Sequence, residues 1–232
     1  MDTIPPLTIS VVIPALNAQA DLARSLSCTR VPGVERIVVD GGSTDGTPQS
    51  ARFLRADRVV LTRAGRALQL QAGYEESHGE VVLFLHADTR LEDGWQEAIA
   101  RALEDPRVQG GAFRLRFDSS RWVYRPLEWL ARVRSRLLGL PYGNQALFAR
   151  RKLLAQIGGI PQTPIFEDAD IAREIREHGR LALLSLRAFA SPRRYEAEGV
   201  VRTLRRSALA WVGYVVDFDR ERLARWYGRR RG

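Results

Sequence analysis

One stretch of the sequence indicates the fold: Val38-Val39-Asp40-Gly41-Gly42-Ser43-Thr44-Asp45-Gly46-Thr47. A β-branched run ends there in an acid, turns through two glycines and enters a helix whose first turn holds Pro48. Glycines let backbone N–H groups approach a ligand closely, and a carboxylate at a strand end can accept hydrogen bonds from a base or ribose. A purely structural alternative, in which Asp40 makes a turn while Ser43 and Thr47 cap the helix, fits this stretch equally well when it is taken alone.

Apolar runs alternate with helical patterns on both sides of this stretch. The sequence predicts strands at 7–13, 36–39, 58–61 and 80–85, and helices at 18–27, 47–56 and 64–77. Further along it predicts strands at 111–117 and 145–149, and helices at 122–138, at 167–178 and from 199 onward. Alternating strands and helices imply right-handed crossovers and an α/β fold whose mostly parallel central sheet carries helices on both faces. Ligands of such sheets bind at the carboxyl ends of the strands.

Composition restricts the class of protein. A chain of 232 residues with 45% hydrophobic and 27% charged residues has enough length and apolar content for one large core, which excludes disordered and collagen-like proteins. The net charge is +9, and residues 193–232 hold 11 arginines and 5 acids, so +6 of it lies in the tail. Such a surplus suits an anionic partner: nucleic acid, anionic lipid or a phosphate-bearing substrate.

The cellular location is predicted from the cysteine content and from the apolar segments of the sequence. Cys28 is the single cysteine, which excludes an internal disulfide and favours the reducing cytoplasm. No signal-peptide pattern and no long apolar run occurs, so we expect neither secretion nor a membrane span. Peripheral attachment at the inner membrane surface stays open.

A second acid follows the buried run at 80–85, in Phe84-Leu85-His86-Ala87-Asp88-Thr89. We expect Asp88 at the same sheet edge as Asp40, with the two acids ending neighbouring strands. A divalent cation, Mn²⁺ or Mg²⁺, that bridges Asp88 to a diphosphate would explain this charge, because such ions prefer carboxylate and phosphate oxygens. Alternatively, Asp88 caps a following helix.

Three acids among four residues start the predicted helix at 167–178: Glu167, Asp168 and Asp170. Capping and the helix dipole account for acids at a helix start. So dense a cluster can also hold a general base, because neighbouring carboxylates raise one another's pKa. Gly143-Asn144-Gln145, just upstream, supplies a tight turn and two amides suited to sugar hydroxyls.

Taken together and in order, these motifs resemble the family 2 glycosyltransferases, which have the GT-A fold. The matching segments are Ser10 to Asn17, Val39 to Gly46, Leu85 to Asp88 and Glu167 to Asp170. A finer resemblance is to the radical-SAM/selenodomain-associated (arsenosugar-biosynthesis-type) subgroup. It rests on Gly65-Arg66-Ala67-Leu68-Gln69, Phe84 to Thr89, Gly143 to Phe148, Glu167-Asp168 and Ser191-Pro192-Arg193-Arg194-Tyr195. The resemblance implies a GT-A-type Rossmann-like domain at 1–195 and a basic, amphipathic helical extension packed on it at 196–232.

The resemblance also implies roles for individual residues. Pro14, Ala15 and Asn17 would line the nucleotide pocket, Asp40 would meet the base or ribose, and Arg66 with Gln69 would flank it. Asp88 would hold the metal, Asp168 would be the catalytic base with Glu167 beside it, and Arg193 and Arg194 would meet the leaving diphosphate. Further contacts to the nucleotide sugar would come from Gly42, Ser43, His86, Ala87, Gly143, Asn144 and Gln145.

The reaction implied is an inverting single displacement, in which a hydroxyl acceptor takes the sugar of a nucleotide-diphosphate sugar with help from Mn²⁺ or Mg²⁺. Three residues depart from the family pattern. Many members have Asp where this chain has His86 and Gly41, and the subgroup usually has Asp where it has Asn144.

Alternatives from other classes are a nucleotidyltransferase-like enzyme and a basic nucleic-acid-binding protein. The first should have a Gly-rich loop where Pro14-Ala15-Leu16-Asn17 stands, and the second lacks a recognised binding signature, so no nucleic acid is expected as partner. Two basic amphipathic segments, 122–138 and the tail, are interpreted first as helices docked on the sheet. An anionic membrane surface, and with it a lipid-linked acceptor, is the second interpretation, and a homodimer contact is the third.

Overall fold

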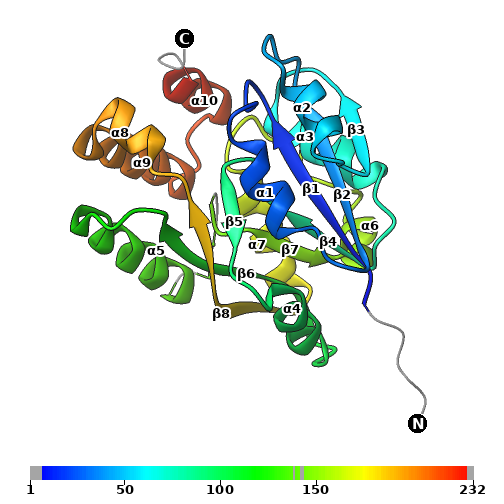
Figure 1. Cartoon of the computed structure of the whole chain (residues 1–232). Helices are drawn as coiled ribbons and strands as arrows, with labels where there is room; N and C mark the ends of the chain where they lie inside the picture. Colours follow the sequence, from blue (N-terminus) through cyan, green and yellow to red (C-terminus); the bar gives the residue numbers. More distant parts are fainter. Residues whose placement is uncertain (1–6, 138, 142–143, 229–232) are drawn as a thin grey trace.

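The computed structural model describes residues 7–137, 139–141 and 144–228, and Figure 1 shows the path of the chain. The strands are β1 (Ile9–Ala15), β2 (Val34–Asp40), β3 (Arg58–Leu61), β4 (Val81–Phe84), β5 (Thr89–Leu91), β6 (Val108–Phe117), β7 (Leu147–Arg150) and β8 (Arg180–Ala190). The helices are α1 (Leu22–Cys28), α2 (Thr47–Phe53), α3 (Arg66–Glu75), α4 (Trp95–Leu103), α5 (Arg125–Leu137), α6 (Arg151–Gln156), α7 (Glu167–Glu177), α8 (Arg193–Glu198), α9 (Val200–Val215) and α10 (Arg220–Gly228). A 3-10 turn, Trp122–Tyr124, precedes α5.

The strands form one sheet in the order β3-β2-β1-β4-β7-β6-β8-β5. Strands β3, β2, β1 and β4 are parallel, as the alternation of the first half predicts, and β6 pairs in parallel with β8. Strand β7 is antiparallel to both β4 and β6, and β5 is antiparallel to β8. The predicted α/β fold with a mostly parallel central sheet is confirmed.

Alternate residues of the central strands face opposite sides, because the side-chain period of a strand is two. On one face, Val11, Val81 and Leu83 pack with residues of α1, α2 and α4. On the other, Val12, Val82 and Phe84 pack with residues of α3, α6 and α7. A strand buried on both faces shows a continuous apolar run rather than an alternating one, which is the pattern these segments have in the sequence.

The second half of the chain builds the other end of the sheet and a third core cluster. In this cluster Phe117 of β6, Tyr124 of the 3-10 turn and Leu127 of α5 pack with Tyr195 of α8 and Leu204 of α9. Helix α8 begins at Arg193, so the expected domain boundary after residue 195 falls inside a helix. Among the described residues, no helix is both long and apolar enough to cross a membrane.

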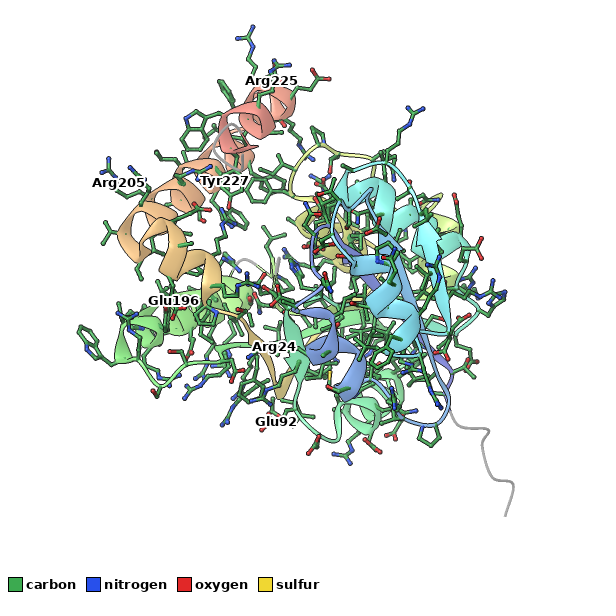
Figure 2. All side chains as sticks on the ribbon, turned by 45° about the horizontal axis from the view of Figure 1, so that its top comes forward. Arg24, Glu92, Glu196, Arg205, Arg225 and Tyr227 are labelled. Carbon is green, nitrogen blue, oxygen red and sulfur yellow. The ribbon has the colours of Figure 1, made fainter. Side chains whose placement is uncertain are left out.

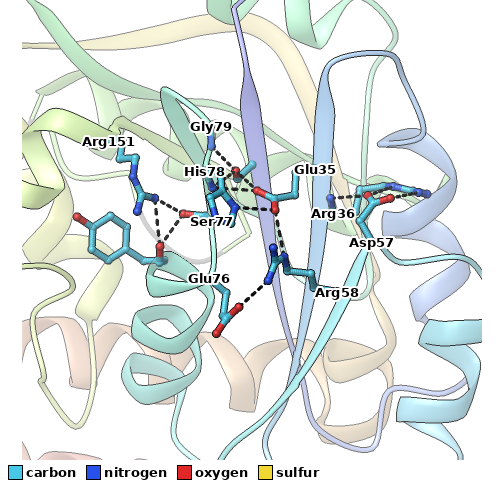
Figure 3. A network of polar contacts seen from close by, with 11 residues as sticks. Glu35, Arg36, Asp57, Arg58, Glu76, Ser77, His78, Gly79 and Arg151 are labelled. Atoms are coloured by element: carbon cyan, nitrogen blue, oxygen red, sulfur yellow. Dashed lines mark hydrogen bonds and ion pairs between the residues drawn. The ribbon is translucent and has the colours of Figure 1, made fainter.

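A polar network ties the amino-terminal parts of β1 and β2 to the turn after α3 (Figure 3). The carboxylate of Glu35 accepts hydrogen bonds from Ser10 Oγ at 2.7 Å and from the backbone N–H of His78 at 3.0 Å. Arg58 of β3 also pairs with Glu35, at 3.4 Å. The carboxyl ends of these strands, where ligands are expected, lie at the opposite edge of the sheet. We therefore assign this network a structural role.

Helix α3 approaches the sheet so closely that one position requires glycine. A Cβ at Gly73 would lie 2.3 Å from Cγ1 of Val12 and 3.0 Å from Cγ2 of Val39. Both neighbours are completely buried. The spacing between α3 and the sheet therefore depends on the missing side chain.

Gly73→Ala should lower the free energy of unfolding by about 1–3 kcal/mol, because overpacking outweighs the helix propensity that alanine adds. Chemical denaturation followed by circular dichroism would measure the loss. Gly228→Ala in α10 is the matched control, since no atom lies within 4 Å of a Cβ there. An equal or greater stability of Gly73→Ala would contradict the close approach.

Candidate active site at the carboxyl ends of the strands

Two loops at the carboxyl ends of β1 and β2 are joined by hydrogen bonds. Asn17 Oδ1 accepts the backbone N–H of Thr44 at 2.9 Å, and the N–H of Asn17 donates to Ser43 Oγ at 2.8 Å. One residue further, the N–H of Ala18 donates to Thr47 Oγ1 at 2.8 Å. Asn17 has φ +49°, and residues 19–21 form a turn, so α1 begins at Leu22 rather than at the expected residue 18. Pro14 and Ala15 precede this seam as the last residues of β1.

Asp40 is buried and binds its own turn. Its Oδ2 accepts the backbone N–H groups of Gly42 at 3.0 Å and Ser43 at 2.9 Å, and its Oδ1 accepts a short hydrogen bond from Ser43 Oγ. Gly42 has φ +89°, which favours glycine. The structure thus gives Asp40 the turn-forming part of its two predicted roles, at the strand end where a nucleotide would bind.

Gln69 of α3 links the same two strand ends. Its Nε2 donates to the carbonyl oxygens of Ala15 and Val39, each at 2.8 Å, and its side chain is buried. Both amide hydrogens are therefore used by the protein. Gln69 positions the loops around the expected nucleotide pocket with its donors already occupied.

Arg66, at the start of α3, joins the two halves of the chain. Its guanidinium donates to Asp168 Oδ2 at 2.9 Å and Oδ1 at 3.2 Å, and it makes a second, short ion pair with Glu167. Its Nη1 lies 3.4 Å from Nδ1 of His86, which follows β4. Four of the predicted site residues, which stand far apart in the sequence, meet here.

Burial strengthens these interactions. Glu167 and Asp168 are 6% and 5% exposed, which would be costly for carboxylates without a cation beside them. Burial raises the pKa of Glu167, although Arg66 acts in the opposite direction. Burial would lower the pKa of Arg66, but Asp168 and Glu167 outweigh it and the pKa is raised, so the guanidinium keeps its charge.

Asp88 lies between β4 and β5. A strand follows it, Thr89–Leu91, so the alternative that Asp88 caps a helix is wrong. The expectation that Asp40 and Asp88 end neighbouring strands is also wrong, because β1 lies between β2 and β4 in the sheet. Burial raises the pKa of Asp88, and the nearby Asp21 raises it further. Within the described residues, Asp88 has no ion-paired arginine.

Asp170 faces away from Arg66, toward the C-terminal helices. Its carboxylate accepts hydrogen bonds from both terminal nitrogens of Arg220, one of them at 3.2 Å, and from the Tyr214 hydroxyl at 3.1 Å. Burial, together with Asp170, raises the pKa of Tyr214 to about 12. Two residues along a helix turn the side chain by about 200°, which is why Asp168 and Asp170 serve different partners.

The residue before these acids is strained. Phe166 adopts φ +67° at the start of α7, a left-handed conformation that is unusual for an aromatic residue. Its ring packs against Trp211 at 5.9 Å and Tyr214 at 5.1 Å between centroids. The C-terminal helices therefore hold the first turn of α7 in place, directly beside Glu167 and Asp168.

Other predicted residues are not brought into this cluster. Arg194 donates to the Tyr227 hydroxyl at 2.7 Å and pairs with Glu198, so it faces the C-terminal helices. Gln145 is buried and uses its amide to tie α5 to β6, through Ser135 at 3.0 Å and the Phe113 carbonyl at 3.1 Å. Ala87 is buried and Asn144 half-buried near the strand ends, and Gly143 lies outside the described residues.

Arg193 does reach the edge of the site, through a partner that the sequence did not suggest. It donates to Asp21 Oδ2 at 2.7 Å, and Asp21 is the carboxylate that acts on Asp88. Asp21, Phe166, Tyr214 and Arg220 all contribute to the site and were not predicted. Such contacts join residues up to 172 positions apart, so no local sequence pattern predicts them.

Comparison with known proteins gives the class, in agreement with this sheet and the groups at its carboxyl ends: the chain is a glycosyltransferase that uses a nucleotide sugar. Residues 10–158 match the model of the family "Glycosyl transferase family 2", and the chain belongs to that family. The GT-A fold expected from the motifs is confirmed by solved structures. This assignment favours the glycosyltransferase prediction over the nucleotidyltransferase and nucleic-acid-binding alternatives.

Several known proteins are similar to this chain. The protein MT1568 of Mycobacterium tuberculosis is 29% identical over 253 residues, covering 94% of this chain and 75% of that protein. Glucosyl-3-phosphoglycerate synthase from M. tuberculosis, solved with Mn²⁺, UDP and glucosyl-3-phosphoglycerate, has a TM-score of 0.61 and 25% identity over 92% of this chain and 81% of its own.

Two further structures show the fold alone. TarS 1–349 of Staphylococcus aureus has a TM-score of 0.58 and 16% identity over 80% of this chain. The mannosyltransferase PcManGT of Pyrobaculum calidifontis, solved with GDP-Man and Mn²⁺, has a TM-score of 0.58 and 21% identity over 79% of this chain. This chain spans 61% of the TarS chain and 59% of the PcManGT chain.

Arg220→Gln should lower the free energy of unfolding by about 3 kcal/mol, because it leaves the carboxylate of Asp170 buried without its main counter-charge. Urea denaturation would measure the loss. Arg222→Gln is the control, since Arg222 pairs with Asp219 on the surface and should matter by about 0.5 kcal/mol or less. Equal effects of the two substitutions would contradict the role of Asp170 as an anchor.

Proposed function

We propose that this protein is an inverting glycosyltransferase that moves a sugar from a nucleotide-diphosphate sugar to a hydroxyl acceptor in a single displacement. The observation that carries the proposal is the buried pair Glu167 and Asp168, held by Arg66 next to His86 at the carboxyl end of β4. A carboxylate is a suitable general base for a hydroxyl, and its position near the expected donor site is what a direct attack requires.

Asp168 is the proposed base. Its carboxylate takes the proton of the acceptor hydroxyl while the hydroxyl oxygen forms a bond to the anomeric carbon. The bond from that carbon to the diphosphate oxygen breaks, and its electron pair leaves with the nucleoside diphosphate. Glu167 shares Arg66 with Asp168 and keeps the guanidinium oriented.

Arg66 has a second part in this mechanism. In the structure Arg66 donates hydrogen bonds to both oxygens of Asp168, and an acceptor hydroxyl needs one of these oxygens. A guanidinium group can bind two oxygens of a phosphate just as it binds the two oxygens of a carboxylate. We infer that an arriving diphosphate draws Arg66 toward itself and frees an oxygen of Asp168, which couples donor binding to activation of the base.

The residues around Asp88 fit a divalent cation. Asp88 is a partly buried acid whose pKa is raised, with the carboxylate of Asp21 nearby and no arginine paired to it among the described residues. No group of three or more His, Cys, Asp or Glu side chains able to hold a metal occurs in the described ranges. Asp88 would therefore share the ion with diphosphate oxygens and water, as Mg²⁺ and Mn²⁺ commonly allow. When bound, Mn²⁺ or Mg²⁺ neutralises charge on the departing diphosphate.

Finer assignments rest on the sequence motifs. We propose that the chain belongs to the radical-SAM/selenodomain-associated subgroup, on the strength of the segments Gly65 to Gln69 and Ser191 to Tyr195. We also propose that residues 1–195 form the catalytic unit, that 196–232 form the helical extension, and that the protein works in the cytoplasm.

Removing the metal should weaken nucleotide binding. Titration calorimetry should show that UDP binds at least about tenfold more tightly with Mn²⁺ than with a chelator, because the cation would offset the repulsion between Asp88 and the diphosphate. Asp88→Asn should abolish the difference, and Asp93→Asn, an exposed acid after β5, should retain it. Equal affinity with Mn²⁺ and with the chelator would contradict the metal site.

Asp168→Asn should reduce sugar transfer by roughly 10² to 10⁴ without weakening UDP binding, because the substitution keeps the shape, removes the proton acceptor and leaves Arg66 freer to meet the diphosphate. Release of nucleoside diphosphate from a panel of nucleotide sugars and acceptors would follow the reaction. Glu174→Gln on the same helix is the control, since Glu174 lies near His178 and away from Arg66. A surviving rate in Asp168→Asn would show that another group is the base.

A further inference from the structure

Helix α5 has two apolar faces, of which only one is used by the fold. Leu127 and Ala131 are buried against the rest of the chain. Turned away from them, Trp129 is 63% exposed and Leu137 77%, and Trp122, in the 3-10 turn before the helix, is 79% exposed. A helix that merely docks on a sheet buries its apolar residues and turns polar ones outward. The packing interpretation of this segment therefore leaves Trp122, Trp129 and Leu137 unexplained.

Helix α9 repeats this arrangement. Thr203 and Ala210 are its buried residues. Its exposed side carries the apolar residues Val201, Leu209, Val212 and Val215, and Val216, directly after the helix, is exposed as well. A shallow apolar pocket, lined by Trp211, Val212, Val215 and Val216, opens on this side.

The two helices belong to one end of the molecule. Both stand beyond β6 and β8, at the end of the sheet opposite β3 (Figure 1). Leu127 of α5 and Leu204 of α9 share the third core cluster, and Arg134 of α5 lies over the ring of Trp211, 5.5 Å from its centroid. We call the exposed sides of α5 and α9, from Trp122 to Leu137 and from Val201 to Val216, the apolar end face.

Positive charge borders the apolar end face. Arg132 and Arg136 of α5, and Arg202 and Arg205 of α9, are exposed, and Figure 2 shows Arg205 on the outer side of its helix. None of these four forms an ion pair with a carboxylate in the part of the chain that the structure describes. Burial lowers the pKa of Arg114, and repulsion from Arg132, Arg136 and Arg187 lowers it further, so positive charge is crowded here.

We propose that the apolar end face docks on an anionic phospholipid bilayer. Tryptophans and aliphatic side chains would enter the interface, and the bordering arginines would pair with lipid phosphates, which is how amphipathic helices bind membrane surfaces. A second copy of the chain would bring the same uncompensated arginines against themselves, so charge complementarity favours lipid. This inference does not depend on the proposed transfer reaction.

The probe is vesicle flotation of the full chain. Vesicles of phosphatidylglycerol mixed with phosphatidylcholine should carry the protein, vesicles of phosphatidylcholine alone should carry much less, and added salt should release it. Trp122→Gln with Trp129→Gln, and separately Arg132→Gln with Arg136→Gln, should each lower the bound fraction about tenfold. These side chains are exposed, so the unfolding temperature should stay the same.

Matched controls lie on α2 and α4, outside the apolar end face. Phe53→Gln removes an aromatic residue that is 86% exposed, and Arg52→Gln with Arg101→Gln removes two exposed arginines, all without loss of vesicle binding. Failure of the unaltered protein to bind anionic vesicles would overturn the proposal. So would a dimer that dissociates on Trp122→Gln with Trp129→Gln while vesicle binding is absent, because a second copy would then be the partner.

Discussion

The ion pairing of Arg66 with Glu167 and Asp168 is the constraint on which the site depends. Two carboxylates that are almost completely buried on consecutive residues are tolerable only if a cation lies between them. The cation comes from α3 in the first half of the chain, and the acids come from α7 in the second half. The interaction therefore does two things at once: it ties α7 to α3, and it gathers the charged groups of the candidate site.

The first turn of α7 is held from its other side by the C-terminal helices. Asp170 is paired with Arg220 and Tyr214, and Phe166 is kept in a left-handed conformation by Trp211 and Tyr214. Strained residues persist where their surroundings determine them strongly, and they are frequent at active sites. The helices after residue 195 are thus part of the framework of the acid pair, whatever else their outer sides contact.

The interpretation of segment 122–138 as a helix docked on the sheet was incomplete. The sequence of α5 predicts an amphipathic helix, and its apolar face was expected to pack on the sheet. In the structure, Leu127 and Ala131 of α5 are buried while Trp129 and Leu137 of the same helix are exposed. A helical pattern shows that a stripe is apolar, and only the neighbouring elements decide whether it is covered.

By itself, the sequence determined the alternation of strands and helices, the parallel first half of the sheet and the family, because strand runs and their polar ends are local patterns. It also predicted that Arg66, His86, Glu167 and Asp168 belong to one site, and the structure brings their side chains together. It did not reveal strand β8, the position of β1 between the strands of Asp40 and Asp88, or the partners of Asp170 and Arg193. Nor could it show that the side-chain amides of Gln69 and Gln145 form hydrogen bonds within the protein. Sheet order and ion pairs join residues far apart in the chain, so only tertiary packing decides them.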